Sequence, residues 1–403
     1  YRNAAFTPYA HTTGKGCTIV PTTGNDCPSY TGTAAKAANA QTSHPKLRST
    51  TKLAIIYSRP AFFAIFAERR NQFRMKLDIA RQPLVPAFLT LFVLAVTTMC
   101  CAGGHLLPAG SGGVPGEVPL AGELLRQFQA ACPVWARIAA GFMILFTGMC
   151  IGRIAIRYNL YTIGTCLPIP LYAIAACGIS IGENYLTGFA ASMLLALAAK
   201  NYSRAFCNGY GFDAIFRASL YLGLLPVVYA PGTPLLLILP LAVLIFRRTF
   251  REAVVALTGL LLPIAAACYV SWGAGGEFTG PLVALGESMT AGLPLRIFTE
   301  LPFPALVMLG AFALLDLTAL LFFLTDLYAT GTKPRFVLFF NIGILVLVWA
   351  LLFSPAATPE IFTLIAVPSA LLIPVFFVRI HRNIALPVYM LLLAATFATI
   401  LLQ

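Results

Sequence analysis

Long apolar runs separated by short polar connections fill the chain from residue 84 onward. A helix needs roughly 20 consecutive apolar residues to cross the hydrocarbon core of a bilayer. Runs near that length predict eleven crossings, at residues 84–106, 134–152, 163–182, 185–199, 211–229, 233–246, 253–272, 303–325, 336–353, 361–378 and 385–402. The fourth and sixth are short, so they are either tilted hairpin partners or extend into their flanking residues. The predicted fold class is all-α, a polytopic transmembrane helix bundle, because the runs lack the alternation of barrel strands.

Composition supports a membrane protein. Of 403 residues, 59% are hydrophobic and only 10% are charged, and the mean hydropathy is +0.84. Soluble domains carry about 25% charged residues. A chain with so few charges cannot cover a water-facing surface, which excludes soluble enzymes and makes the lipid bilayer its expected partner.

Basic residues gather at alternate connections, which predicts the orientation. They precede the first run or follow the even-numbered runs: Lys76, Arg81, Arg153, Arg157, Lys200, Arg204, Arg247, Arg248, Arg251, Lys333, Arg335, Arg379 and Arg382. The other connections hold mainly glutamates. Since cytoplasmic loops carry the excess of Lys and Arg, we expect the N-terminus inside and the C-terminus outside.

Residues 1–74 differ from the rest of the chain. They hold ten Lys/Arg against two acidic residues and show little periodic apolar pattern, so we expect a disordered basic tail. The sequence from Met75 resembles a natural start, which makes the tail an upstream extension and 75–403 the transmembrane domain. The alternative is a basic arm for anionic lipid or nucleic acid. We expect the bilayer, and not nucleic acid, to be the protein's partner.

Asp316 is an acidic residue near the middle of the run 303–325. A carboxylate at the bilayer centre costs about 2.5–3.5 kcal/mol on insertion scales, so it must face the bundle interior, be protonated or find a partner. It is either a proton, cation or substrate site, or a structural carboxyl bonded to a neighbouring Ser, Thr or Tyr.

Two long connections, 107–133 and 273–302, lie on the predicted outer side. Leu120, Leu124, Leu125 and Phe128 predict a short amphipathic helix in the first, and the second has similar helical spacing from Phe278 to Met289. Glu117 and Glu123 are candidate general bases there. Arg126 and Arg296 are candidates to hold a lipid phosphate. The alternative for all four is solvated loop charge.

Three smaller patterns carry expectations about packing and pairing. Asp213 and Arg217 lie four residues apart and should form an ion pair, and Arg251-Glu252 resembles a similar interfacial pair. Gly148 and Gly152 indicate close helix packing. The cysteines inside the apolar runs have no C-x-x-C spacing and no histidine partner, so no metal site is expected.

Several short stretches resemble an uncharacterised family of multi-spanning bacterial inner-membrane proteins. They are residues 159–172 with Leu167-Pro168, Gly211-Phe212-Asp213-Ala214, Val228-Tyr229-Ala230-Pro231, the block 246–252 followed by Gly259 to Pro263, and Val367-Pro368-Ser369 with Arg379. The resemblance covers residues 75–403. It implies a bacterial inner-membrane protein and transfers no catalytic residue. Where the family often has Arg-Glu-Trp, this chain has Arg251-Glu252-Ala253.

Three functions remain open on these residues. The architecture resembles that of GT-C-type membrane glycosyltransferases, which implies a polyprenyl-phosphate-linked sugar as donor, with Glu117 or Glu123 as base and Arg126 or Arg296 on the phosphate. The second is a transporter or carrier that uses Asp316. The third is a non-catalytic membrane scaffold. No soluble-enzyme motif or cofactor motif separates them.

Overall fold

The structure is a computed structural model that describes residues 79–101, 120–207, 211–290, 295–327 and 331–402. These residues all belong to one compact unit, Phe73–Gln403. The expected tail at residues 1–74 lies outside the described residues, as does Glu117.

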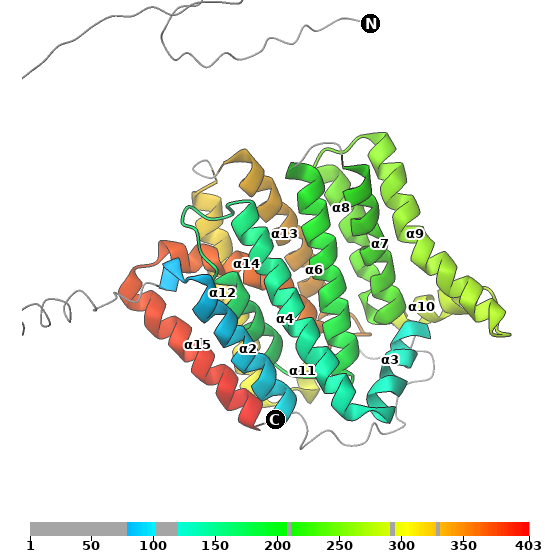
Figure 1. Cartoon of the computed structure of the whole chain (residues 1–403), viewed down its shortest axis with the longest axis horizontal. Helices are drawn as coiled ribbons and strands as arrows, with labels where there is room; N and C mark the ends of the chain where they lie inside the picture. The colour runs from blue at the N-terminus through cyan, green and yellow to red at the C-terminus, as the bar shows by residue number, and fades with distance from the viewer. Residues whose placement is uncertain (1–78, 102–119, 208–210, 291–294, 328–330, 403) are drawn as a thin grey trace, which may run out of the picture. The chain divides into compact units, whose positions relative to one another are not determined.

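The described residues form helices and contain no strand, which confirms the all-α class. The elements are η1 (Ile79–Arg81), α2 (Leu84–Cys101), α3 (Leu120–Ala131), α4 (Pro133–Arg157), α5 (Pro168–Gly178), α6 (Tyr185–Cys207), α7 (Phe212–Val228), η2 (Ala230–Leu237), α8 (Ile238–Ile245), α9 (Phe250–Gly273), α10 (Gly280–Thr290), α11 (Arg296–Glu300), α12 (Phe303–Thr325), α13 (Thr332–Leu351), α14 (Ile361–Arg379) and α15 (Arg382–Leu402), most of which are labelled in Figure 1.

Seven of the described helices are long and apolar enough to cross a membrane: α2, α4, α9, α12, α13, α14 and α15. Large apolar side chains lie exposed on all of these helices except the buried α14. On α9, for example, Val254, Leu257 and Leu261 are exposed. Exposure of such an apolar surface to water is unfavourable, whereas its exposure to lipid is not. The length and composition of these seven helices thus indicate a membrane-embedded protein. Each of the eleven predicted runs coincides with a helical element, while the count of eleven crossings and the orientation stay predictions.

The third, fourth and sixth predicted runs differ from the observed helices in length or continuity. The fourth run was predicted to end at residue 199, but α6 continues to Cys207, so it extends into its flanking residues. The third run shortens to α5, which has only 11 residues. The sixth divides into the 3₁₀ segment η2 and the eight-residue α8. Pro231 and Pro234 explain that division, because proline lacks the N–H that a continuous α-helix requires.

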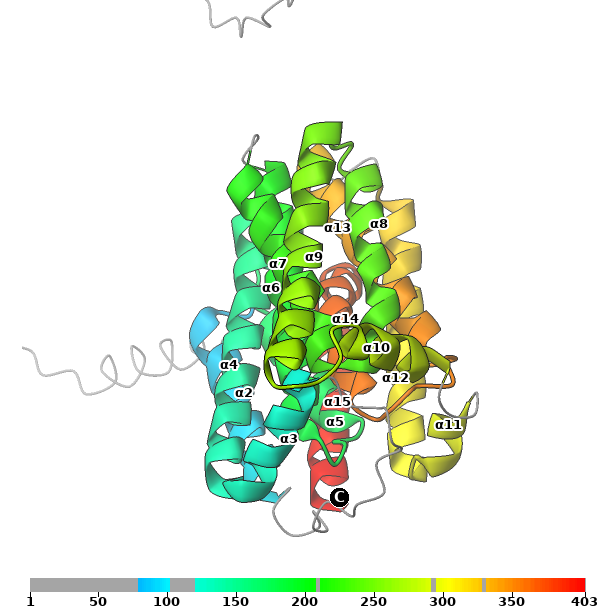
Figure 2. The ribbon, with the colours of Figure 1, turned by 90° about the vertical axis from the view of Figure 1, so that its right-hand side faces the viewer.

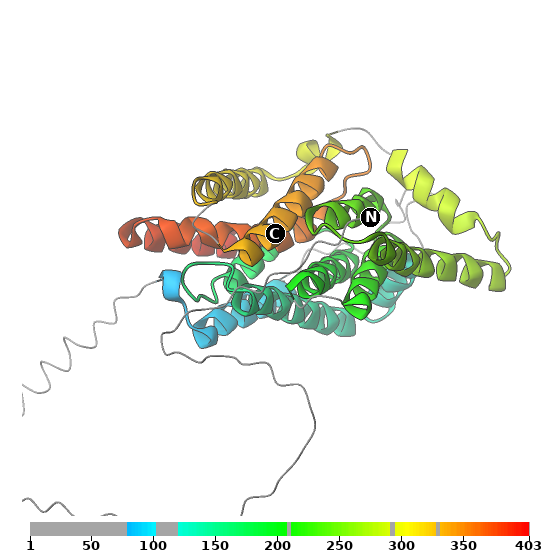
Figure 3. The same ribbon diagram turned by 90° about the horizontal axis from the view of Figure 1, so that it is seen from above.

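The central element of the bundle is α14. Its side chains from Ile361 to Pro374 are all buried, and it packs against α5, α6, α12 and α13. A helix that is apolar all round is the kind that fills a core. Figure 1 shows α14 behind α4, and Figure 2 shows it inside the bundle. Seen from above in Figure 3, α15 and α9 lie at opposite ends of the described bundle.

Glycines bring the backbones of α7 and α9 close together. A Cβ on Gly223 of α7 would lie 2.2 Å from the Leu260 carbonyl oxygen of α9, and one on Gly259 of α9 would lie 2.8 Å from the Phe216 carbonyl oxygen. Neither helix can therefore carry a larger residue at these contacts without moving.

The predicted role of Gly148 and Gly152 is confirmed. A Cβ on Gly148 would lie 2.7 Å from the Leu91 side chain of α2, and one on Gly152 would lie 2.5 Å from the Ile169 side chain of α5. These glycines therefore pack α4 against two helices of the same chain.

Candidate functional site: a buried carboxyl beside the central helix

Asp316 of α12 lies in the interior of the bundle, as its cost in lipid requires. Its side chain is 4% exposed. The Ser369 hydroxyl of α14 donates a hydrogen bond of 2.6 Å to Oδ2 of the carboxyl, and the Trp349 side chain of α13 interacts with the same carboxyl. The other oxygen, Oδ1, is buried with no hydrogen-bond partner among the described residues. Three helices thus enclose a carboxyl that is only half satisfied.

The segment of α14 around Pro368 receives a second polar side chain. The amide nitrogen of Asn341 on α13 donates to the Pro368 carbonyl oxygen at 2.8 Å. Asn341 is 3% exposed, and its own carbonyl oxygen has no described partner. Consecutive residues of the central helix, Pro368 and Ser369, therefore bind polar groups from α13 and α12. Buried oxygens without a donor are uncommon in folded proteins, and this region holds two.

A cavity of about 300 Å³ lies along the same helices toward the C-terminal end of α12. Its lining includes Leu160, Tyr161, Thr162, Phe323, Asp326, Leu338, Val375, Val378 and Arg379. Phe323 follows Asp316 by seven residues on α12, a rise of about 10 Å at 1.5 Å per residue. Residues seven apart share a helix face, so this cavity and Asp316 lie on the same face of α12.

Two polar interactions border the cavity. Tyr161, in the connection between α4 and α5, donates its hydroxyl to the Leu371 carbonyl oxygen at 2.8 Å. Burial raises the pKa of Tyr161 well above its ordinary value, so the phenol remains a neutral donor. At the mouth, the Arg379 guanidinium pairs with the Asp326 carboxylate, joining the C-terminal ends of α14 and α12.

The structure brings together two of the four predicted outer residues, Glu123 and Arg126, and does not describe the side chains of the other two. The Arg126 guanidinium pairs with Glu123 at 2.9 Å within α3, and the Gln127 side chain donates to Glu123 at 3.1 Å. Glu117 lies outside the described residues, and the side chain of Arg296, the first residue of α11, is not described. Glu123 is therefore engaged by two side chains of its own helix.

The predicted amphipathic helix is confirmed as α3, and the helical spacing in the second long connection is confirmed as α10. Gln129 anchors α3 to the start of α6, since its amide nitrogen donates to the Glu183 carbonyl oxygen at 2.7 Å and its amide oxygen accepts from the Leu186 N–H at 3.3 Å. The end of the bundle that holds α3 is thus ordered by side-chain contacts.

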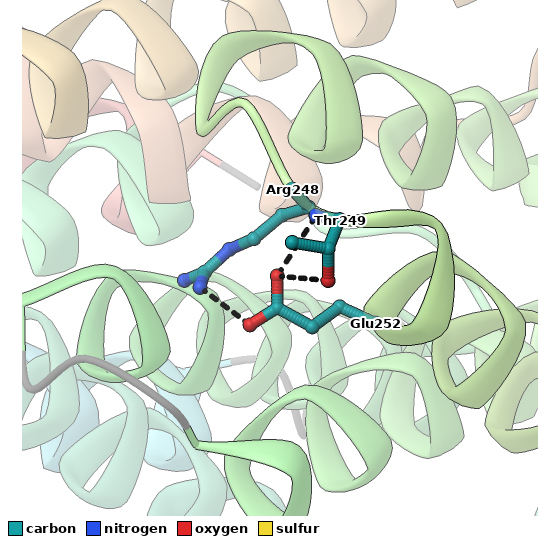
Figure 4. Close-up of polar contacts among 3 residues, drawn as sticks. All are labelled: Arg248, Thr249 and Glu252. Atoms are coloured by element: carbon teal, nitrogen blue, oxygen red, sulfur yellow. Dashed lines mark hydrogen bonds and ion pairs between the residues drawn. The ribbon is translucent and has the colours of Figure 1, made fainter. Parts of the chain in front are cut away.

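One predicted ion pair is confirmed and the other is wrong. Asp213 and Arg217 pair at 2.9 Å on the first turns of α7. Glu252 pairs with Arg248 at 3.1 Å and not with Arg251. Figure 4 shows the reason: one carboxylate oxygen of Glu252 turns back to the Thr249 N–H at 3.0 Å, as in a capping box, and the other faces Arg248. Neighbouring residues on a helix do not face each other, so Arg251 points elsewhere.

Sequence reasoning identified Asp316 but missed Ser369, Trp349 and Asn341. Asn341 carried a readable signal, because it is a side-chain amide inside a predicted membrane-crossing run. Ser369 carried no signal that linked it to Asp316, since isolated serines also occur in four other predicted runs. Comparison of the chain with family models, with curated proteins and with solved structures finds no match.

Proposed function

We propose that the protein is a multi-pass carrier of the bacterial inner membrane in which Asp316 binds a proton or another cation that is coupled to transport. The observation that supports the proposal is the half-satisfied carboxyl itself: Ser369 engages Oδ2, and Oδ1 is buried without a described partner. Ionisable residues inside a membrane usually belong to ion or proton pathways.

A purely structural role accounts for this carboxyl less well. A hydroxyl pair would join α12 to α14 without the cost of a buried acid, about 2.5–3.5 kcal/mol on insertion scales. In a hydrogen bond with a purely structural role, both groups should be satisfied, because an unsatisfied buried polar group costs free energy. One oxygen of the Asp316 carboxyl is nevertheless unsatisfied. That oxygen is free to bind a proton or a small cation.

The surroundings of Asp316 also suit a carrier. The cavity lined by Phe323 and Arg379 lies on the side of the Asp326–Arg379 pair, and Phe323 is about 10 Å from Asp316 along α12. The central helix α14 contains Pro368 and Pro374, and helix-breaking residues in membrane helices accompany substrate sites in many transporters. A local change in α14 would alter the hydrogen bond between Ser369 and Asp316, which couples helix movement to cation binding.

The test is proton flux into vesicles that contain the purified full chain. A potassium gradient with valinomycin sets the membrane potential, and a trapped pH dye records acidification. We expect flux above that of protein-free vesicles, loss of that flux in Asp316→Asn, and normal flux in the matched control Asp213→Asn, whose carboxylate is exposed. Equal flux in wild type and Asp316→Asn, or wild-type flux no higher than in empty vesicles under gradients of both H⁺ and Na⁺, contradicts the proposal.

The second candidate is sugar transfer from a polyprenyl-phosphate donor at the end of the bundle where α3 lies. The anchored amphipathic helix α3 favours it, because such a helix lies flat in a membrane interface. Glu117 or Glu123 would act as base, and Arg126 or Arg296 would hold the phosphate. Glu123 must first leave Arg126. Loss of an envelope glycan in Glu123→Ala cells, with Asp316→Ala cells normal, would support transfer over transport. Normal glycans and normal flux in both variants would leave the scaffold role.

The same proposal includes membership in the uncharacterised bacterial inner-membrane family, the eleven crossings and the orientation. A reporter fused after Gln403 checks the topology. We expect a reporter that works only outside the cytoplasm to be active there. Activity of a cytoplasm-only reporter at that position contradicts an odd number of crossings.

A further inference from the structure

Two helices of the bundle bring four basic side chains to one place. Arg153 and Arg157 lie four residues apart near the C-terminal end of α4, and Lys200 and Arg204 lie four apart on α6. All four line one cavity of about 90 Å³ between these helices. We call these four residues the basic cleft.

The basic cleft lacks a compensating acid in the described part of the chain. No described carboxylate forms an ion pair with any of the four, and no acidic residue lines the cavity. Like charges four apart on a helix repel each other, and here two such pairs face each other. The helix dipoles favour cations at these ends, but that effect does not require two helices to direct their cations into one cavity.

An apolar cavity of about 530 Å³ continues from the basic cleft. Arg153, Arg157 and Lys200 line both cavities, and the rest of the larger one is Leu84, Phe146, Met149, Cys150, Gly152, Ile156 and Ile169. This volume falls within the roughly 300–1,000 Å³ of small-molecule sites. Phe146, Met149 and Ile156 are exposed on the outer face of α4, where lipid chains are the available apolar ligands.

We infer that this composite pocket binds a phospholipid with an anionic headgroup, taken from the leaflet that contacts the C-terminal ends of α4 and α6. The phosphate lies among the basic cleft residues, and an acyl chain occupies the apolar cavity between Leu84, Phe146 and Ile169. Basic pockets between membrane helices bind anionic lipid headgroups in this way. Charge complementarity identifies the headgroup, and the continuous apolar lining identifies a lipid over a soluble anion. The site is independent of Asp316 and of the proposed transport.

Native mass spectrometry of the full chain in detergent tests the inference. The probes are phosphatidylglycerol, zwitterionic phosphatidylcholine of the same acyl chains, and inorganic phosphate. We expect phosphatidylglycerol to bind more tightly than phosphatidylcholine by at least tenfold, and to weaken with added salt. The exposed pair Arg157→Gln and Arg204→Gln should weaken phosphatidylglycerol binding about 30-fold, if each basic residue near a membrane contributes about fivefold.

Controls separate this site from the general lipid shell. Arg251→Gln removes an exposed arginine of α9 that lines neither cavity, and it should leave binding unchanged. A substitution in the apolar cavity, Phe146→Ala, should weaken binding of long-chain but not short-chain phosphatidylglycerol. The inference is overturned by equal retention of both lipids, by equal losses in Arg251→Gln and the double variant, or by displacement of phosphatidylglycerol with inorganic phosphate at equal concentration.

Discussion

Removal of the Glu252 carboxylate should destabilise the junction between α8 and α9 more than any exposed charge change. The Glu252 side chain is 5% exposed and its partner Arg248 is 12% exposed. Glu252 accepts from the Thr249 N–H, the Thr249 hydroxyl and the Arg248 guanidinium. Glu252→Ala leaves all three donors without this acceptor.

The magnitude follows from the two roles of the carboxylate. Loss of a helix cap costs about 0.5–2 kcal/mol, and loss of one partner from a buried ion pair costs about 3–5 kcal/mol. The two overlap, because the same carboxylate serves both, and the partial exposure of Arg248 favours the lower figure. We expect Glu252→Ala to lower the free energy of unfolding by about 3 kcal/mol. Glu252→Gln keeps an acceptor oxygen but loses the charge, so it should cost about 1–2 kcal/mol.

The assay is reversible unfolding in mixed micelles, followed by fluorescence of the three tryptophans. Arg248→Met measured alone and with Glu252→Ala completes a double-mutant cycle. Joint removal of a buried pair is often nearly neutral, so the double variant should regain about 2 kcal/mol over the sum of the single changes. Strict additivity of the two changes, or a loss in Glu252→Ala below about 0.5 kcal/mol, as for an exposed pair, would refute the reasoning.

Five further substitutions test the packing and the helix ends by the same assay. Gly223→Ala should lower the free energy of unfolding, because overpacking against the Leu260 carbonyl costs about 1–3 kcal/mol and exceeds the gain of roughly 1 kcal/mol in helix propensity. At Gly310 nothing lies within 4 Å of an added Cβ, so Gly310→Ala should show the gain alone. Arg247 has φ +48°, so Arg247→Gly should change stability by less than about 1 kcal/mol, whereas Arg247→Val should destabilise by about 2 kcal/mol. Arg379→Gln breaks the ion pair with Asp326, in which the arginine is half exposed, so the free energy of unfolding should fall by less than about 1 kcal/mol. A larger loss would contradict the assignment of this pair to the surface.

Hydropathy predicted which segments are helical but not where the helices end. Apolar run length locates a segment because lipid requires about 20 apolar residues. Backbone hydrogen bonding does not stop at the first charge, however. The second run was predicted to end at residue 152, yet α4 continues through Arg153 to Arg157, since long basic side chains reach the interface while their stems stay in the apolar layer. The helix end must therefore be sought beyond the first arginine.

Asp316 was predictable as a candidate and Ser369 was not, for a physical reason. A buried acid is costly anywhere along an apolar helix, so its position alone marks it. The partner of that acid depends on which helices are neighbours. Ser369 is distant in sequence and lies on a helix that is apolar on every face. Helical periodicity cannot orient such a helix, because it has no polar side to face away from the core.

Local spacing predicts some side-chain contacts and not others, as the partner of Glu252 and the basic cleft show. Thr249 and Glu252 have the T-x-x-E spacing of a capping box, which predicts that the carboxylate turns back toward residue 249 and away from Arg251. Arg153 with Arg157, and Lys200 with Arg204, likewise predict one charged face on each helix. Within one helix, spacing alone identifies which side chains share a face. Only the packing of α4 against α6 turns two ordinary basic ends into one cleft, and that contact depends on shape complementarity between apolar surfaces that their composition does not distinguish.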